Sequence, residues 1–265
     1  MLENILKPDW LERKPRFAFL IGLVYAIIGI VAAMIIFPKS QGIASIAFLS
    51  MLLIPSLNKI LAIEEIQDFE SKKFSFKKIW RDHNDVIEVY FLLFLGIFVA
   101  YALFSIRFPN LLVQGVFDNQ LKVIGVNTGQ AIGGVDFYSI LFNNFRILVI
   151  FAILSLVIGA GSIFFLAWNA SVWGVVFGFI ATSSNNAFNS LFGIFLKVMP
   201  HMFLEAGAYF FAIIAGGIMS QAVLREKMGS KKFNYAMKDG LVFLVVSLIL
   251  LVLGAFVETY IYTLL

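Results

Sequence analysis

The stretch FAFLIGLVYAIIGIVAAMIIF, from Phe17 to Phe37, decides the class of fold. It contains no charged side chain, and about 20 consecutive apolar residues are what an α-helix needs to cross the hydrocarbon core of a bilayer. The run is longer than the apolar region of a cleavable signal peptide, and no small-x-small cleavage site follows it. We therefore expect a retained transmembrane helix.

The composition of the whole chain agrees with this expectation. Of its 265 residues, 61% are hydrophobic and only 14% are charged, whereas soluble domains are roughly 45–50% apolar and about 25% charged. The chain has no cysteine, which excludes a disulfide framework, a thiolate metal site and a cysteine nucleophile. The net charge of +4 is modest, so we expect no nucleic-acid partner.

Further apolar runs predict an all-α, polytopic transmembrane helical bundle of about six to seven helices, with five as a lower alternative. The runs that we expect to cross as full helices are Phe17–Phe37, Ile43–Ile63 with a kink at Pro55, Val86–Ile106, Ile147–Trp168, His201–Val223 and Leu241–Ile261. Two pieces, Asn169–Ala181 and Leu191–Met199, are too short for a standard crossing. Pro200 separates the second piece from the next helix, so the two pieces form either a re-entrant pair or an additional crossing.

Three clusters of basic residues set the expected orientation, because Lys and Arg are enriched in cytoplasmic loops. The clusters are Lys7, Arg13, Lys14 and Arg16; Lys72, Lys73, Lys77, Lys78 and Arg81; and Arg225, Lys227, Lys231, Lys232 and Lys238. We expect a multi-pass protein of the cell membrane with a cytoplasmic N-terminus and one membrane domain spanning 1–265. The segment of about 64–85, where Phe74, Phe76 and Trp80 alternate with cations, is predicted to be cytoplasmic and interfacial. The loop of about 107–138 is predicted to be extracytoplasmic, with a short interfacial segment near Val116–Ile124.

Polar residues inside the predicted spans are costly and are therefore candidate functional residues. His201 and Glu205 are four positions apart and share one helix face, and Pro200 breaks the helix just before them. The other candidates are Glu258 in the last span and the amides Asn143, Asn144 and Asn169. Two interpretations stay open for the His201/Glu205 pair. The pair joins helices by hydrogen bonds, to each other or to Asn side chains, or it serves transport, proton relay or ligand binding.

The remaining motifs give less specific information. Asn143 and Asn144 are interpreted as the N-cap of the fourth span, and Gly174 and Gly178 form a GxxxG pattern that favours close helix packing or dimerisation. The chain has no His-Glu-x-x-His, P-loop or Gly-x-Ser-x-Gly motif and only two histidines. We therefore expect no enzyme, no cofactor and no metal site.

Four stretches, in order from about Tyr138 onward, carry a resemblance to a known family. They are Leu141-Phe142-Asn143-Asn144-Phe145-Arg146; Trp168-Asn169 with the glycine-bearing segment to Ile180; Met199-Pro200-His201 with Glu205; and Ala236-Met237-Lys238-Asp239-Gly240 before the span that holds Glu258. Together they resemble the stage II sporulation protein M family of integral membrane proteins. The chain departs from the family's Leu-Pro-His-Gly, since Met199 precedes Pro200 and Met202 follows His201.

The family's named role is in engulfment during spore formation, where it looks like a membrane-embedded component of a complex with peptidoglycan-remodelling proteins and is not known as the hydrolase. Relatives exist in organisms that do not sporulate, so the resemblance does not transfer the sporulation process to this chain. The leading hypothesis is a non-enzymatic scaffold or subunit of an envelope-associated membrane complex. Its partners would be the lipid bilayer, membrane or envelope proteins and further copies of the chain. The alternative is a transporter, channel or lipid translocator that uses the intramembrane pair His201/Glu205.

Overall fold

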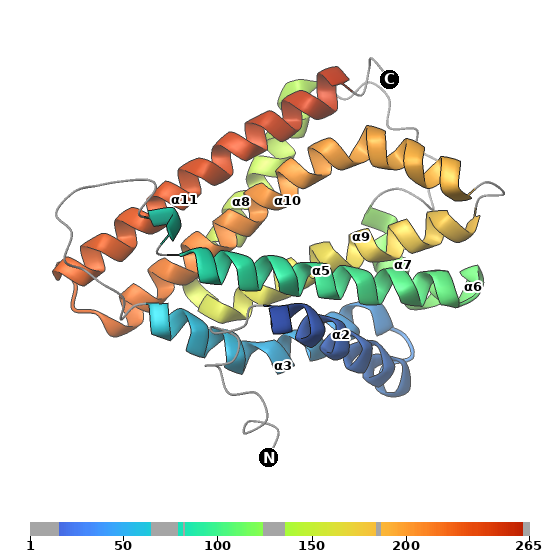
Figure 1. The fold of residues 1–265 in the computed structure, drawn as a ribbon, viewed down its shortest axis with the longest axis horizontal. Helices are drawn as coiled ribbons and strands as arrows, with labels where there is room; N and C mark the ends of the chain where they lie inside the picture. The colour runs from blue at the N-terminus through green and yellow to red at the C-terminus, as the bar shows by residue number, and fades with distance from the viewer. Residues whose placement is uncertain (1–15, 65–78, 82, 124–135, 184–186, 262–265) are drawn as a thin grey trace.

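The computed structural model describes residues 16–64, 79–81, 83–123, 136–183 and 187–261, with the backbone alone for 59–64, 160, 183, 187–199 and 261. Within these ranges the secondary structure is entirely helical (Figure 1). The long helices are α2 (Arg16–Ile36), α3 (Gln41–Glu64), α5 (Asn84–Arg107), α8 (Phe137–Ile158), α9 (Ile163–Ser183), α10 (Ala187–Arg225) and α11 (Lys231–Phe256). All seven contain stretches long and apolar enough to cross a membrane, which confirms the predicted polytopic bundle.

Between and after the long helices lie four shorter elements. These are α6 (Asn110–Val116), α7 (Asp118–Val123), a 3-10 turn (Gly159–Ser162) and a π-helical turn (Val257–Ile261). The first two fall in the loop of about 107–138, and α7 lies inside the segment predicted to be interfacial. The aromatic and basic residues at 72–78, which were predicted to lie at the membrane surface, are outside the described residues.

The fourth predicted span is placed wrongly. The prediction began it at Ile147 and ended it at Trp168, whereas α8 starts at Phe137 and ends at Ile158. Gly159 then adopts a left-handed φ of 59°, a conformation that glycine tolerates and that ends helices. The chain restarts as α9 at Ile163, so the supposedly short piece Asn169–Ala181 belongs to a full-length helix.

The predicted division at Pro200 is also wrong. Helix α10 runs without interruption through Pro200 and has 39 residues, so the re-entrant pair is replaced by one long helix. A proline inside a helix removes one backbone hydrogen bond and bends the axis, but it need not end the helix. Figure 1 shows α10 bent between its gold N-terminal part and its orange C-terminal part.

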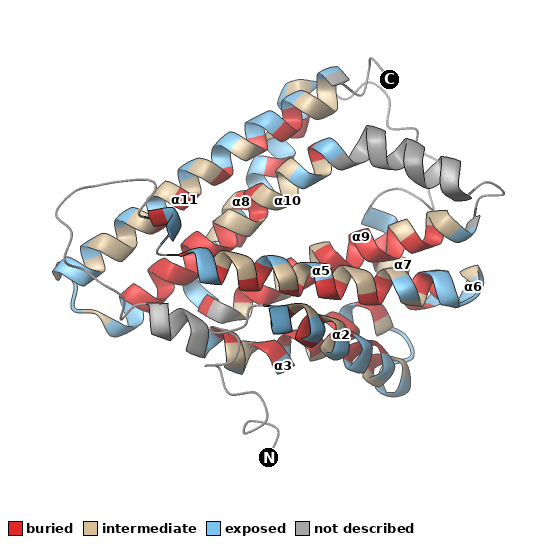
Figure 2. Ribbon diagram, viewed as in Figure 1, coloured by how far each residue is buried: buried red, intermediate tan, exposed pale blue. Residues whose placement is uncertain are grey.

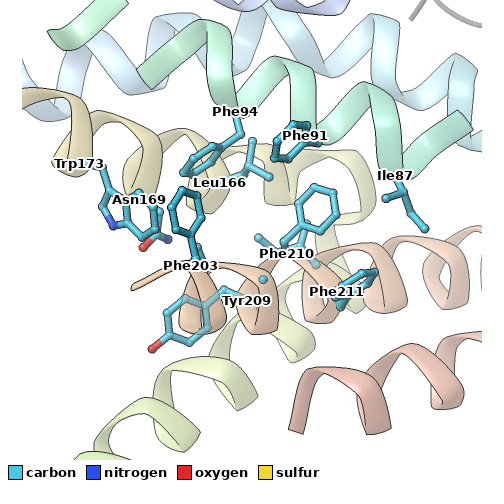
Figure 3. Close-up of a pocket in the computed structure, with 13 residues that line it drawn as sticks. Ile87, Phe91, Phe94, Leu166, Asn169, Trp173, Phe203, Tyr209, Phe210 and Phe211 are labelled. Atoms are coloured by element: carbon cyan, nitrogen blue, oxygen red, sulfur yellow. The ribbon is translucent and has the colours of Figure 1, made fainter. Parts of the chain in front are cut away.

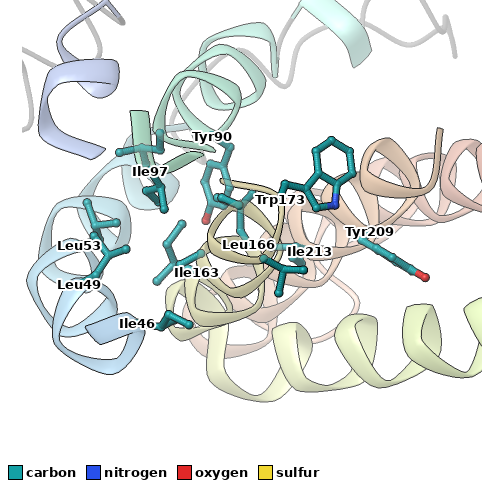
Figure 4. Close-up of a cluster of buried hydrophobic side chains, with 14 of the residues drawn as sticks. Ile46, Leu49, Leu53, Tyr90, Ile97, Ile163, Leu166, Trp173, Tyr209 and Ile213 are labelled. Atoms are coloured by element: carbon teal, nitrogen blue, oxygen red, sulfur yellow. The ribbon is translucent and has the colours of Figure 1, made fainter. Parts of the chain in front are cut away.

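The helices pack in two groups. One group contains α2, α3, α5 and α9, and the other contains α8, α10 and α11; the groups meet mainly where α9 packs against α10. Figure 2 shows burial concentrated in α9 and in the C-terminal part of α10. Figure 4 shows side chains from α3, α5 and α10 gathered around Ile163 and Leu166 of α9.

Glycines set how closely the helices of the first group approach. A Cβ atom on Gly174 would lie 2.5 Å from the Phe98 carbonyl oxygen, and one on Gly178 would lie 2.5 Å from Ser105 Cβ. Only glycine fits at such distances, so the GxxxG pattern of α9 packs directly against α5. The predicted close packing is confirmed as a contact within the chain.

Large apolar side chains cover the outside of the bundle. Ile35 on α2, Phe142 and Val157 on α8 and Leu253 on α11 are all exposed, the first three by more than 70%. Soluble monomers rarely show apolar patches of this extent. These side chains suit contact with lipid, since the polar backbone beneath them is already paired within the helices.

Candidate functional site

A hydrogen bond joins α8 and α10 inside the second helix group. Asn144 lies in the second turn of α8 with its side chain buried, and its Nδ2 donates to Oε1 of Glu205 on α10. Both residues were predicted site residues. Their positions correct the interpretation of Asn143 and Asn144 as an N-cap, because the N-cap is Asp136, whose side chain accepts from the Tyr138 N–H at 2.8 Å.

Glu258 extends this contact to α11. It lies in the π-helical turn that follows α11, and its carboxyl group lies close to that of Glu205. One turn earlier, Gly254 brings α11 close to α10, since a Cβ there would lie 3.1 Å from Glu205 Cγ.

His201 shares the helix face of Glu205, as predicted, but Glu205 takes its partners from other helices. The His201 side chain is 9% exposed, and its buried Nδ1 has no hydrogen-bond partner among the described residues. Unsatisfied buried polar atoms are uncommon in folded proteins. Pro200, the residue before it, is exposed.

The other two predicted amides lie outside this contact. Asn143 is exposed, and its Nδ2 donates weakly to Asn144 Oδ1 at 3.4 Å. Asn169 donates to the Phe165 carbonyl oxygen of its own helix at 2.9 Å. The structure therefore brings together Asn144, Glu205 and Glu258, which we call the carboxyl cluster, and leaves Asn169 apart from it.

Sequence reasoning missed the aromatic residues beside the carboxyl cluster. Tyr209, one turn along α10 from Glu205, packs edge-on against Phe151 of α8 with ring centroids 5.3 Å apart. Phe151 in turn stacks on Phe165 of α9 at 4.6 Å. The spacing of four between Glu205 and Tyr209 was the available signal, because it places both on one helix face.

A second polar contact was also missed. His83 caps the N-terminus of α5, and its Nε2 lies 3.2 Å from Oδ2 of Asp239 on α11. The His83 ring also packs edge-on against Phe243 at 5.4 Å. This contact ties the first helix group to the second, and 156 positions separate the two residues.

An apolar cavity of about 230 Å³ lies between α5, α9 and α10 (Figure 3). Its described lining includes no charged residue, and most of its walls are aromatic: Phe91, Phe94, Trp173, Phe203, Tyr209, Phe210 and Phe211. Asn169 supplies the one amide side chain. The cavity is thus apolar, whereas the carboxyl cluster is polar, although α10 contributes residues to both.

No metal centre is present among the residues that the structure describes. No group of three or more His, Cys, Asp or Glu residues in that part of the chain lies close enough to hold an ion. Within the carboxyl cluster, the donor and acceptor groups are directed at one another across three helices. What the arrangement does is join the three helices.

The apolar spans, the lipid-suited exterior and the polar groups buried between helices define a polytopic α-helical membrane protein. Residues 89–261 match the family model of stage II sporulation protein M, and the chain belongs to this family. The match begins in α5, earlier than the four stretches noted in the sequence, and reaches the turn that holds Glu258. Comparison with curated proteins and with solved structures found no match.

Proposed function

We propose that the chain is a non-enzymatic scaffold or subunit of an envelope-associated complex in the cell membrane, with its N-terminus in the cytoplasm. The observation that carries the proposal is the carboxyl cluster, in which Glu205 bonds with Asn144 of α8 and lies close to Glu258, in the turn that follows α11. Polar groups used in this way fix the geometry of a bundle.

Two serines support the same role. Ser155 of α8 donates to the Ile213 carbonyl oxygen at 2.5 Å, and Ser247 of α11 donates to the Ala208 carbonyl oxygen at 2.7 Å. Both acceptors lie on α10. Hydrogen bonds therefore join α8 and α11 to α10 at two different positions along α10. A scaffold that presents a binding surface to partners needs helices held in a fixed arrangement of this kind.

Affinity purification of the full chain in lipid nanodiscs, followed by mass spectrometry of all retained proteins, tests this role. We expect an envelope or membrane protein in stoichiometric amount. The control is the same purification of the double variant Asn144→Ala/Glu205→Ala, which should retain less of that partner if the fixed geometry of the bundle presents the binding surface. Recovery of the chain with lipid alone would contradict the scaffold role.

A transport role is the second candidate, and the buried, unpartnered Nδ1 of His201 favours it. This atom lies one helical turn from the carboxyl group of Glu205, and intramembrane ionisable groups of this kind form proton pathways in transporters. In proteoliposomes, Glu205→Gln should abolish flux or change its pH dependence. Glu226→Gln, the same chemical change at the end of α10, is the control, and unchanged flux in both variants would exclude this role.

A further inference from the structure

Aromatic contacts mark the two ends of the cavity between α5, α9 and α10, and one side of the cavity is open. At one end Phe211 packs against Trp80, with ring centroids 5.9 Å apart. At the other end Trp173 packs edge-on against Phe94 at 5.6 Å and against Phe203 at 5.8 Å. On the open side Phe91 and Phe203 are each more than half exposed. Figure 3 shows the labelled side chains spread between these two ends.

The depth of the cavity corresponds to one leaflet of a bilayer. On α5 the lining residues Ile87, Phe91 and Phe94 follow the first residue of the helix by 3, 7 and 10 positions. At 1.5 Å per residue they lie about 5 to 15 Å from the helix end. Half of a hydrocarbon core is about 15 Å thick. With the first residue of α5 placed at the membrane surface, the cavity spans the depth of one leaflet.

Helix α9 places its lining residues at the same depth. Leu166, Asn169 and Trp173 follow its first residue by 3, 6 and 10 positions. Trp173 packs against Phe94, so the last lining residue of α9 lies beside the last lining residue of α5. Trp80 lies before α5 with 40% of its surface exposed, as expected of an indole at the membrane interface.

The chemistry of the lining excludes water and polar solutes. An apolar cavity of about 150 Å³ stays dry and binds benzene, and this cavity is larger. Asn169 is the one amide on its wall, and one of its two side-chain N–H groups is donated to the Phe165 carbonyl oxygen. The shallow depth also disfavours a partner's transmembrane helix, which needs a groove along the full core of about 30 Å.

We propose that the cavity binds one acyl chain of a phospholipid from the leaflet in which α5 begins. The headgroup lies near Trp80, and the chain extends past Ile87 and Phe91 to Trp173 at the midplane. The bilayer supplies such chains at high local concentration, and filling the cavity gains the contacts that its walls otherwise lack. The bound lipid thus bridges the two helix groups, because α5 and α9 belong to one and α10 to the other.

Photolabelling of the full chain in phosphatidylcholine nanodiscs tests the site. Two lipid analogues are used, one with a diazirine near the headgroup and one with a diazirine near the chain end. Mass spectrometry of the peptides should place the first label near Trp80 and Ile87 and the second near Phe94 and Trp173. Uniform labelling of all exposed helix faces, with no dependence on diazirine depth, would overturn the proposal.

Two variants that fill the cavity complete the test. Ala206→Phe adds a ring from α10, and Ile87→Phe adds one from α5, so failure of one variant to fold leaves the other. Each should reduce labelling of the cavity to the level seen on the exposed face of α11. Val245→Phe, which adds the same ring on that exposed face, should leave cavity labelling unchanged.

Two results contradict the acyl-chain assignment. One is unchanged cavity labelling in a filling variant that folds, as judged by an unaltered size-exclusion profile and melting temperature. The other is a stoichiometric membrane protein that crosslinks to a photoreactive amino acid at position 91. That result would assign the cavity to a partner protein.

Discussion

Asn144 and Glu205 are separated by 61 positions in the chain, yet they form a side-chain hydrogen bond between α8 and α10. The bond lies on the helix face that Glu205 shares with His201, and Glu258 meets the same carboxyl group from α11. A single glutamate therefore connects all three helices of the second group. The contribution of this connection to stability can be measured.

A double-mutant cycle of Asn144→Ala and Glu205→Ala should show a coupling free energy of about 0.6 kcal/mol, and up to about 1.7 kcal/mol, the range found for hydrogen bonds between membrane helices. The measurement is reversible unfolding by SDS in bicelles. Ser155→Ala with Glu205→Ala is the matched cycle, because Ser155 also joins α8 to α10 but bonds the Ile213 carbonyl oxygen and not Glu205, and it should give no coupling. Equal coupling in the two cycles would show that the Asn144 bond contributes nothing specific.

Close packing of α8 on α10 should make Gly216 intolerant of a side chain. A Cβ on Gly216 would lie 2.5 Å from Ser155 Cβ and 2.8 Å from the Ala152 carbonyl oxygen. Overpacking of this kind costs about 1–3 kcal/mol, so Gly216→Ala should lower the free energy of unfolding by that amount. Gly207→Ala is the control, because its Cβ would meet only the flexible end of Leu250 at 3.3 Å. Equal stability of the two variants would refute the packing argument.

Helix ends were predicted well where the apolar run and the helix end together. The run Phe17–Phe37 ends one position after α2, because Pro38 limits both. The predicted span Val86–Ile106 similarly lies within α5. At these helix ends, the residues that end the apolar run also end the helix.

The break between α8 and α9 could not be read from hydropathy. Both arms are apolar, and the break depends on the backbone of Gly159, whose φ is 59°. Glycine adopts this conformation in turns, but glycine residues are also frequent inside membrane helices. The presence of a glycine alone therefore does not predict a break. At Pro200 the error was the reverse, since α10 continues through a residue that bends a helix without having to end it.

The candidate site was predicted as a set of residues but not as a set of contacts. Periodicity correctly placed His201 and Glu205 on one face. The partner of Glu205 depends on the register between α8 and α10, which no pattern within α10 encodes. The His83–Asp239 contact has the same origin, because it depends on how the two helix groups meet.

The cap of α8 should depend on pH. Asp136 lies outside the span, and its hydrogen bonds to the Tyr138 N–H and the Ser139 hydroxyl lower the pKa of its carboxyl group. A lowered folded-state pKa means that the cap's contribution is complete above the unfolded pKa of about 3.9 and is lost as the pH falls through the folded value.

Hydrogen exchange of the Tyr138 amide in nanodiscs measures this loss. Protection, corrected for the intrinsic exchange rate, should decrease below about pH 4 in the wild-type chain. Asp136→Asn keeps an acceptor oxygen without a titrating group, so its corrected protection should not change over that range. An equal acid-induced loss in the variant would assign the effect to some other group.

The contact between His83 and Asp239 should hold the start of α5 against α11. The native chain has no cysteine, so Asp85→Cys and Lys238→Cys, both at exposed positions, can carry spin labels without background. Adding His83→Ala should broaden the distance distribution between the labels and lower stability by about 1 kcal/mol, the usual net value of one hydrogen bond. Ser50→Ala, which removes a buried bond within α3, should lower stability without broadening the distribution. A distribution unchanged by His83→Ala would mean that apolar packing alone joins the two helix groups at this end.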